Sequence, residues 1–229
     1  MKSEKITKRA YGDACGMAHA LELLGERWAL IVLRELLLGP KRFGELRADI
    51  PGISANVLTQ RLEGLEASGL VVRRRLPPPA SAQVYELTHW GYEVEPISQA
   101  LGRWATRSPL HDPTAPISAV SVLLSFRTML DARRAAGIDA AIGFRFGDHA
   151  YLGRLTAAGF PIVRGSAEAA DVTFAGDARA LAGAVYGGVP LAALEEAGAL
   201  RIEGDRRLAE RFVTLFPLPE KVAAPGVPA

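Results

Sequence analysis

The feature that most constrains this chain is the stretch from residue 39 to 76, which reads GPKRFGELRADIPGISANVLTQRLEGLEASGLVVRRRL. Apolar residues at helical spacing predict a helix over about residues 42–49 and a second one after Ser54, and Pro51-Gly52 predicts the turn between them. The Ser54 hydroxyl can accept a hydrogen bond from an unpaired first-turn N–H, so Ser54 is expected to cap the second helix. Two short helices followed by an arginine-rich strand are typical of a winged helix-turn-helix, and this order predicts DNA binding.

The second of these helices is expected to read the DNA sequence. Its outward side chains are mostly small or amide-bearing, and Asn56 and Gln60 can make paired hydrogen bonds to adenine. The alternative for both amides is ordinary solvated helix surface. Lys41 and Arg42 are assigned to phosphates and Arg61 to the DNA backbone. The complete set of predicted DNA contacts is Lys41, Arg42, Ser54, Asn56, Thr59, Gln60, Arg61, Arg73 and Arg75.

A β-hairpin is expected to form the wing. Residues 70–76 and 83–87 are rich in strand formers, and the tip between them reads PPPASA, whose prolines prevent further ladder hydrogen bonds. Alternation along the first strand sends Arg74 to the face opposite Arg73 and Arg75. Only some of the three arginines can therefore touch DNA.

The helix after the wing carries a short apolar seam. Thr88 can cap this helix, and apolar residues follow at spacings of three, four and three, which suggests a partner helix. The candidates for a dimer interface are Val94, Ile97, Leu101 and Trp104.

The pattern changes after a segment with three prolines, residues 108–116, which predicts a linker. A helix over about residues 120–136 is followed by short strand-like runs and further helices, so this half is expected to be α+β. We expect a mainly α winged helix-turn-helix domain for DNA binding and dimerisation over residues 1–107. A linker over 108–117, an α+β domain over 118–217 and a disordered tail over 218–229 complete the prediction.

Composition narrows the classes of function. The 229 residues carry a net charge of only +2, and the N-terminus lacks the apolar segment of a signal peptide, so the prediction is a cytoplasmic protein without membrane partners. The four histidines are scattered and the chain has one cysteine, so no metal site is expected. No phosphate-binding loop, dinucleotide fingerprint or nucleophile–base set is recognisable, so we expect no catalytic residues and no cofactor.

The N-terminal region resembles the HxlR family of bacterial winged-helix regulators. The motifs that carry the resemblance are Cys15, Gly25-Glu26-Arg27-Trp28, Leu33-Arg34-Glu35-Leu36, Gly39–Leu46, Pro51–Ser54, Leu58–Leu62, Gly69-Leu70-Val71 and Tyr85–Thr88. They span about 75 residues in the family's order. The resemblance implies a homodimer in which each subunit places one recognition helix in a major groove of double-stranded operator DNA, with a wing beside it.

Cys15 is the candidate sensor. The resemblance implies this role, because several HxlR-type proteins respond to oxidants or electrophiles through a cysteine at this place. A cysteine near a helix N-terminus has its thiolate stabilised by unpaired N–H groups. The alternative is a small buried hydrophobic residue without redox chemistry.

The C-terminal half resembles the sterol-carrier-protein fold. The resemblance rests on Phe144–Asp148, Asp171–Phe174, Asp177 before a helix that ends Tyr186-Gly187-Gly188, and Leu200–Asp205 before Leu215-Phe216. It implies a sheet covered by helices that can enclose a tunnel for a lipid-like ligand. The candidate lining residues are Phe144, Phe146, Phe174, Tyr186, Phe212 and Phe216. The alternative is that these aromatic side chains fill the core.

These features together predict a dimeric bacterial transcriptional regulator, a repressor rather than an enzyme. Its control is expected to come from an apolar small-molecule effector in the second domain or from modification of Cys15. The rival hypothesis is a lipid-binding carrier protein whose helical domain serves mainly for dimerisation.

Overall fold

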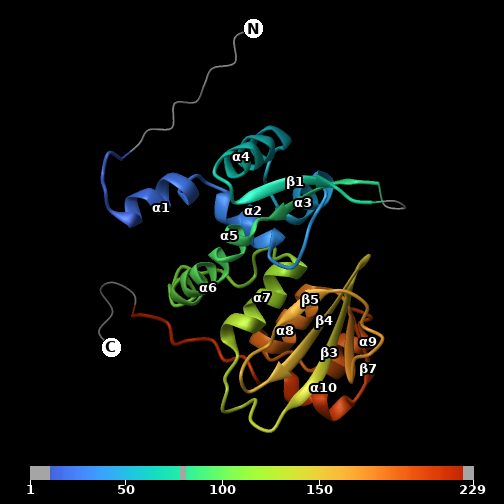
Figure 1. The fold of residues 1–229 in the computed structure, drawn as a ribbon. Coiled ribbons are helices and arrows are strands. Elements are labelled where there is room, and N and C mark those ends of the chain that lie inside the picture. Colours follow the sequence, from blue (N-terminus) through green and yellow to red (C-terminus); the bar gives the residue numbers. More distant parts are fainter. Residues whose placement is uncertain (1–10, 78–80, 224–229) are drawn as a thin grey trace. The chain divides into compact units, whose positions relative to one another are not determined.

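The structure, a computed structural model, describes residues 11–77 and 81–223. The chain divides into two compact units, Met1–Val94 and Glu95–Ala229, coloured blue to green and green to red in Figure 1. Each unit is described by itself.

The first unit is a small helical domain with a two-stranded hairpin. Its elements are α1 (Gly16–Leu24), α2 (Ala29–Leu36), α3 (Phe43–Asp49), α4 (Ala55–Ala67), β1 (Val71–Arg75), β2 (Gln83–Leu87) and α5 (His89–Tyr92). The apolar stripes of three helices meet in its core, which includes Leu33, Leu36, Leu46, Leu58, Leu62 and Leu65. This order confirms the winged helix-turn-helix predicted from the sequence.

Local signals in the sequence fix the ends of α4. The backbone N–H of Val57 donates to Ser54 Oγ over 3.3 Å, so Ser54 caps the helix as predicted. The helix ends at Ser68, and Gly69 follows with a φ of +74°, a left-handed conformation that glycine adopts without steric cost. The α4 helix therefore has defined limits on both sides.

The wing is an antiparallel hairpin in a single register. Val71 pairs with Leu87 and Arg75 with Gln83, and both strands lie within the predicted ranges. Lys41 forms an isolated antiparallel β-bridge with Tyr85 of β2. The Lys41 N–H donates to Tyr85 O over 3.0 Å, and the Tyr85 N–H donates to Lys41 O over 2.8 Å. The predicted proline-rich tip falls partly on residues 78–80, which lie outside the described residues.

The helix predicted after the wing is split in two. Thr88 caps α5 as expected, with Gly91 N donating to Thr88 Oγ1 over 3.0 Å. Glu93 ends α5, and α6 then runs from Val94 to Ala105. Contacts group α6 from Glu95 onward with the second unit, earlier in the chain than the linker predicted over residues 108–117.

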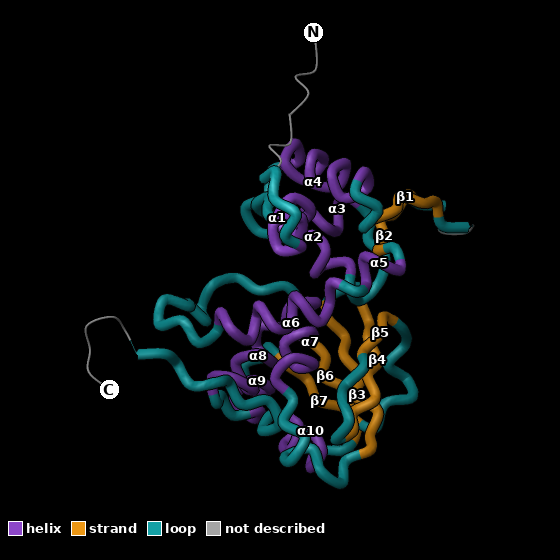
Figure 2. The backbone as a smooth tube through the Cα atoms, turned by 60° about the vertical axis from the view of Figure 1, so that its left-hand side comes forward, coloured by secondary structure: helices purple, strands orange, loops and turns teal. Residues whose placement is uncertain are grey.

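The second unit is an α+β domain. Its elements after α6 are α7 (Ala119–Met129), β3 (Asp139–Phe146), β4 (His149–Thr156), β5 (Ile162–Arg164), β6 (Val172–Gly176), α8 (Ala178–Gly187), α9 (Leu191–Glu196), β7 (Leu200–Gly204) and α10 (Arg206–Phe212). The strands form one sheet in the order β5-β4-β3-β6-β7, in which β3 and β6 are parallel and the other pairs antiparallel. Figure 2 shows the helices of this unit on one face of the sheet.

The α7 helix is shorter than the predicted helix over residues 120–136. Leu130 leaves the helical conformation, and the backbone N–H of Asp131 donates to Leu215 O over 2.9 Å. The Asp131 carboxylate accepts from the N–H groups of Arg133 and Arg134. This aspartate organises a turn where helical periodicity alone predicted continued helix.

Part of the segment predicted as a tail is in contact with the rest of the second unit. Val222 N donates to Arg107 O over 2.8 Å, and Lys221 Nζ donates to Ser108 O over 3.0 Å. The remainder of the predicted tail, residues 224–229, lies outside the described residues.

Candidate nucleic-acid interface

The outward face of α4 carries the predicted readout side chains. Ser54, Asn56, Thr59 and Gln60 are all exposed. The carboxamides of Asn56 and Gln60 have no hydrogen-bond partner within the described part of the chain, so both their donors and their acceptors are available. Thr59 Oγ1 donates to Ala55 O over 3.0 Å and keeps its acceptor capacity.

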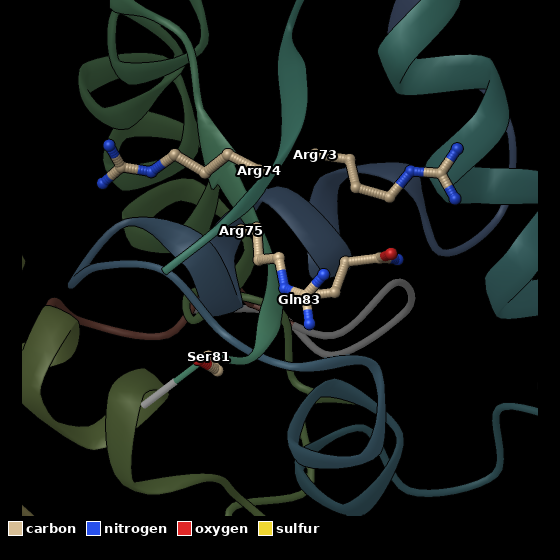
Figure 3. A pocket seen from close by; sticks show the side chains of 5 residues that line it. All are labelled: Arg73, Arg74, Arg75, Ser81 and Gln83. Atoms are coloured by element: carbon tan, nitrogen blue, oxygen red, sulfur yellow. The ribbon is translucent and has the colours of Figure 1, made fainter. Parts of the chain in front are cut away.

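The wing presents three exposed arginines. They line an open hollow of about 580 Å³ together with Ser81 and Gln83. Figure 3 shows Arg73 and Arg74 extending to opposite sides of β1, as strand alternation predicts. Arg74 pairs with Glu86, and Arg73 Nε lies 3.5 Å from Glu66 Oε1.

Arg75 differs from its two neighbours in having no ion pair among the residues that the structure describes. Its partner across the hairpin is Gln83, a neutral side chain. Sequence reasoning missed Ser81 and Gln83 as members of this surface, because their place beside the arginines depends on the hairpin register. No local signal fixes that register, because the predicted strands, residues 70–76 and 83–87, differ in length and allow more than one pairing.

Two further predicted contacts have different surroundings. Arg42 is exposed, and its backbone N–H donates to Glu45 Oε2 over 2.6 Å at the start of α3. Arg61 is largely covered and its Nη2 lies 3.0 Å from Glu26 Oε2. A contact between Arg61 and a phosphate would require this pair to open.

Lys41 requires a correction. Its side chain is only 3% exposed and points into the domain, where Nζ lies 2.8 Å from Glu35 Oε2 and 2.6 Å from Asp49 Oδ2. Burial disfavours the charged form of Lys41, but the two carboxylates more than offset it, so the pKa of Lys41 lies above its ordinary value. The assignment of Lys41 to a phosphate is wrong for this structure, since its charge is already neutralised inside the fold.

Cys15 is exposed and is the N-cap residue of α1. The N–H groups of Ala18 and Met17 stabilise the thiolate and hold the pKa of Cys15 below its ordinary value. The exposed position argues against the alternative of a buried hydrophobic cysteine.

One face of α6 is apolar and exposed, and another side of the helix is polar and in contact with α7. Ile97, Leu101 and Trp104 are 56%, 46% and 71% exposed, whereas Val94 is buried. On the polar side, the Glu95 carboxylate lies 2.9 Å from Arg127 Nη2 of α7 and also accepts from Gln99 Nε2 over 2.8 Å. Arg103 adds a hydrogen bond to the carbonyl of Thr128 at the end of α7.

The aromatic side chains of the second unit pack against one another. The ring of Phe212 lies 5.0 Å from Phe174, 6.0 Å from Phe144 and 4.9 Å from Phe216, measured between centroids. Phe146 is buried beside Phe144. Tyr186 OH lies 2.7 Å from Ser125 Oγ, and burial raises the pKa of Tyr186 above its ordinary value. A ligand could enter among these rings only by displacing them, because rings at these distances are in van der Waals contact.

Within residues 11–77 and 81–223, no group of three or more His, Cys, Asp or Glu side chains is placed to hold a metal ion. No helix in the same ranges is long and apolar enough to cross a membrane.

The fold and the exposed surfaces of the first unit define a helix-turn-helix transcriptional regulator. Residues 23–111 match the model of the HxlR-like helix-turn-helix family. The chain is 38% identical over 89 residues to the HTH-type transcriptional regulator YodB of Bacillus subtilis, covering 39% of this chain and 80% of that protein. It is 37% identical over 87 residues to the uncharacterised HTH-type transcriptional regulator YvaP of the same organism, covering 38% of this chain and 81% of that protein. The chain belongs to the HxlR-like helix-turn-helix family.

Solved structures similar to this chain include reduced YodB from B. subtilis and reduced HypR, described as a redox regulator. The former is 34% identical with a TM-score of 0.39 and covers 44% of this chain and 100% of that chain. The latter is 32% identical with a TM-score of 0.37 and covers 40% of this chain and 90% of that chain.

The second unit matches a different family model. Residues 117–222 match the model described as alkyl sulfatase C-terminal. The chain therefore joins an HxlR-like domain to a second domain whose likeness is to part of another kind of protein.

Proposed function

We propose that this chain is a homodimeric repressor that binds operator DNA through α4 and the wing, with its input supplied by the second unit or by Cys15. The observation that carries the DNA-binding part is the pair of exposed amides on α4, Asn56 and Gln60, which have no hydrogen-bond partner among residues 11–77 and 81–223. The exposed arginines of β1 supply positive charge on the same unit, and Arg73 is linked to α4 through Glu66. Amides placed this way read base edges, while the arginines contribute affinity that does not depend on sequence.

Binding measurements test this proposal. The wild-type chain is used to enrich a duplex from a random-sequence pool, and its affinity for that duplex is compared with its affinity for a random duplex of equal length. We expect a preference of about 1,000-fold or more. The variant Asn56→Ala with Gln60→Ala should lose most of this preference and keep its salt dependence. Failure of the wild-type chain to enrich any duplex would favour the rival carrier function.

The dimer is proposed to form through the exposed apolar face of α6. Ile97, Leu101 and Trp104 would be covered by the same face of a second copy, which gives a short apolar seam between antiparallel or crossed helices. Leu101→Glu should shift the chain to monomer in sedimentation velocity at micromolar concentration. Arg107→Gln, an exposed change outside the seam that also lowers the net charge by one, is the charge-matched control.

The second unit is proposed to be a sterol-carrier-like effector domain. The polar contacts of Glu95 and Arg103 fasten α6 to α7, so a rearrangement of α7 would be carried to the proposed dimer helix. An apolar ligand would control DNA binding only if it prefers one arrangement over the other. Palmitate titrated below its micelle concentration onto the complex with the enriched duplex should change the affinity. An unchanged affinity together with unchanged intrinsic fluorescence would exclude this apolar ligand.

Cys15 is proposed as a second, independent input. Its exposure and lowered pKa favour attack on quinones or oxidants near neutral pH. Release from the duplex by benzoquinone should disappear in Cys15→Ser. Release that persists in this variant would remove Cys15 from the mechanism.

A further inference from the structure

Lys41 joins three elements of the first unit. Through its side chain it contacts Glu35 of α2 and Asp49 at the end of α3, and through its backbone it pairs with Tyr85 of β2. Asp49 stands just before the turn that leads to Ser54, the cap of the recognition helix α4. Lys41 thus contacts both the end of α3, which leads into α4, and β2, the second strand of the wing.

The partners of Lys41 are held in turn. Arg34 Nε and Nη2 both donate to Glu35 Oε1, over 3.0 and 2.8 Å, which leaves Oε2 to Lys41. Glu35 is 0% exposed, and its two oxygens thus have separate cationic partners. This division fixes the orientation of the carboxylate, and the carboxylate then fixes the position of Nζ.

The contact of Lys41 with the wing runs through the backbone of Tyr85. Tyr85 is buried and pairs across the hairpin with Arg73. The bridge between Lys41 and Tyr85 therefore fixes the position of the wing strands, and of Arg73, relative to Lys41. The α4 amides and the wing arginines belong to separate segments of the chain. Both must meet one duplex at once, which requires their relative position to be held to about 0.5 Å.

We infer that Lys41 is a positioning residue for DNA recognition, whose buried contacts with Glu35 and Asp49 and backbone bridge to Tyr85 hold α4 and the wing in the arrangement that reads sequence. Buried ion pairs of this kind add little net stability compared with apolar side chains of equal size, and in some proteins they select one arrangement among similar ones. Lys41 acts without touching DNA. The inference rests on the proposed binding of DNA by α4 and the wing.

The test is the charge-neutral double variant Glu35→Met with Lys41→Met. Methionine has nearly the length of both side chains, so the interior stays filled while the ionic contacts vanish. Arg34 and Asp49 are partly exposed and regain water. The matched control is Arg145→Met with Glu203→Met, an ion pair on the sheet of the second unit.

Three quantities are measured for both double variants and for the wild-type chain. They are the affinity ratio between the enriched and random duplexes, the salt slope on the random duplex, and the urea unfolding curve. For Glu35→Met with Lys41→Met we expect the ratio to fall about tenfold, the loss of about one paired base contact, with unchanged salt slope and a folded first unit. The control should leave all three quantities as in the wild type.

Other results would overturn the inference. A ratio within twofold of the wild type in a folded variant would make Lys41 a purely structural residue. A salt slope reduced by about 0.9 per protomer would mean that Lys41 does reach a phosphate.

A second variant covers the case in which the double variant unfolds. Asp49→Asn keeps the shape of a partly exposed side chain and removes the charge that holds the end of α3 on Lys41. It should lower the ratio about threefold, and an unchanged ratio would defeat the inference. If the wild-type chain enriches no duplex, the proposed function fails as well, whereas an unchanged ratio in a discriminating wild type defeats the inference alone.

Discussion

Single replacements of the wing arginines separate contact with phosphate from simple net charge. Arg75 is exposed and has no ion pair within the described residues, whereas Arg74 extends to the other side of β1 and pairs with Glu86. Arg75→Ala and Arg74→Ala remove the same charge from adjacent positions. We expect only Arg75→Ala to remove a contact with DNA.

The magnitude follows from counterion release. Each phosphate contact contributes about 0.9 to the slope of log affinity against log salt concentration, so a dimer that loses Arg75 twice should lose about 1.8. Between about 50 and about 200 mM salt, the wild-type chain should therefore lose about 12-fold more affinity than Arg75→Ala. Arg74→Ala should keep the wild-type slope, apart from a small uniform offset in affinity.

Fluorescence anisotropy with a labelled random duplex at four salt concentrations measures these slopes. Thermal unfolding by circular dichroism checks that both variants are folded. Equal changes of slope in the two variants would refute the reasoning, because net charge and not the geometry of the wing would then govern binding.

Three further predictions concern stability and reactivity. Lys41→Met alone should lower the free energy of unfolding of the first unit by about 3 kcal/mol in urea, because it takes the Lys41 ammonium away from the buried Glu35 carboxylate. Glu35→Met with Lys41→Met should recover most of this loss. Iodoacetamide should alkylate Cys15 with a pH midpoint below that of the same chain in guanidinium chloride, because helix N–H groups lower the pKa of the thiol only in the folded state; equal midpoints would contradict this. Phe212→Ala should destabilise the second unit by about 3–5 kcal/mol, since this ring touches several others in the core. A loss below about 1 kcal/mol would mean that the ring is loosely packed, with open space beside it.

Much of the first unit could be predicted because its signals are local. The cap at Ser54, the apolar stripe of α4 and the alternation of the wing strands each depend on residues close together in the chain. The hairpin register of the wing does not follow from the predicted strand limits. In the second unit, the turn at Gly147-Asp148 joins β3 to β4 as its turn residues predict.

Residues with more than one plausible environment could not be placed this way. Lys41 stands beside Arg42 in a basic run, and nothing local distinguishes a phosphate contact from a buried ion pair. Its burial depends on carboxylates from α2 and from the far end of α3. The spacing of Leu101 and Trp104 predicts an apolar seam on α6, and both side chains are exposed. The polar contacts on the other side of α6 could not be predicted, because their partner Arg127 lies in α7, beyond the predicted linker.

The sequence by itself determined the order of helices and strands, the winged helix-turn-helix and the row of amides that faces outward from α4. Helix caps, apolar periodicity and strand alternation depend on residues close together in the sequence, so the sequence alone reveals them. Only the tertiary structure decided which charges remain available: Lys41 is neutralised inside the fold, Arg74 is paired, and Arg75 is exposed without an ion pair among the described residues. The physical reason is that the state of a charge depends on its neighbours in space, and those neighbours come from elements far apart in the sequence.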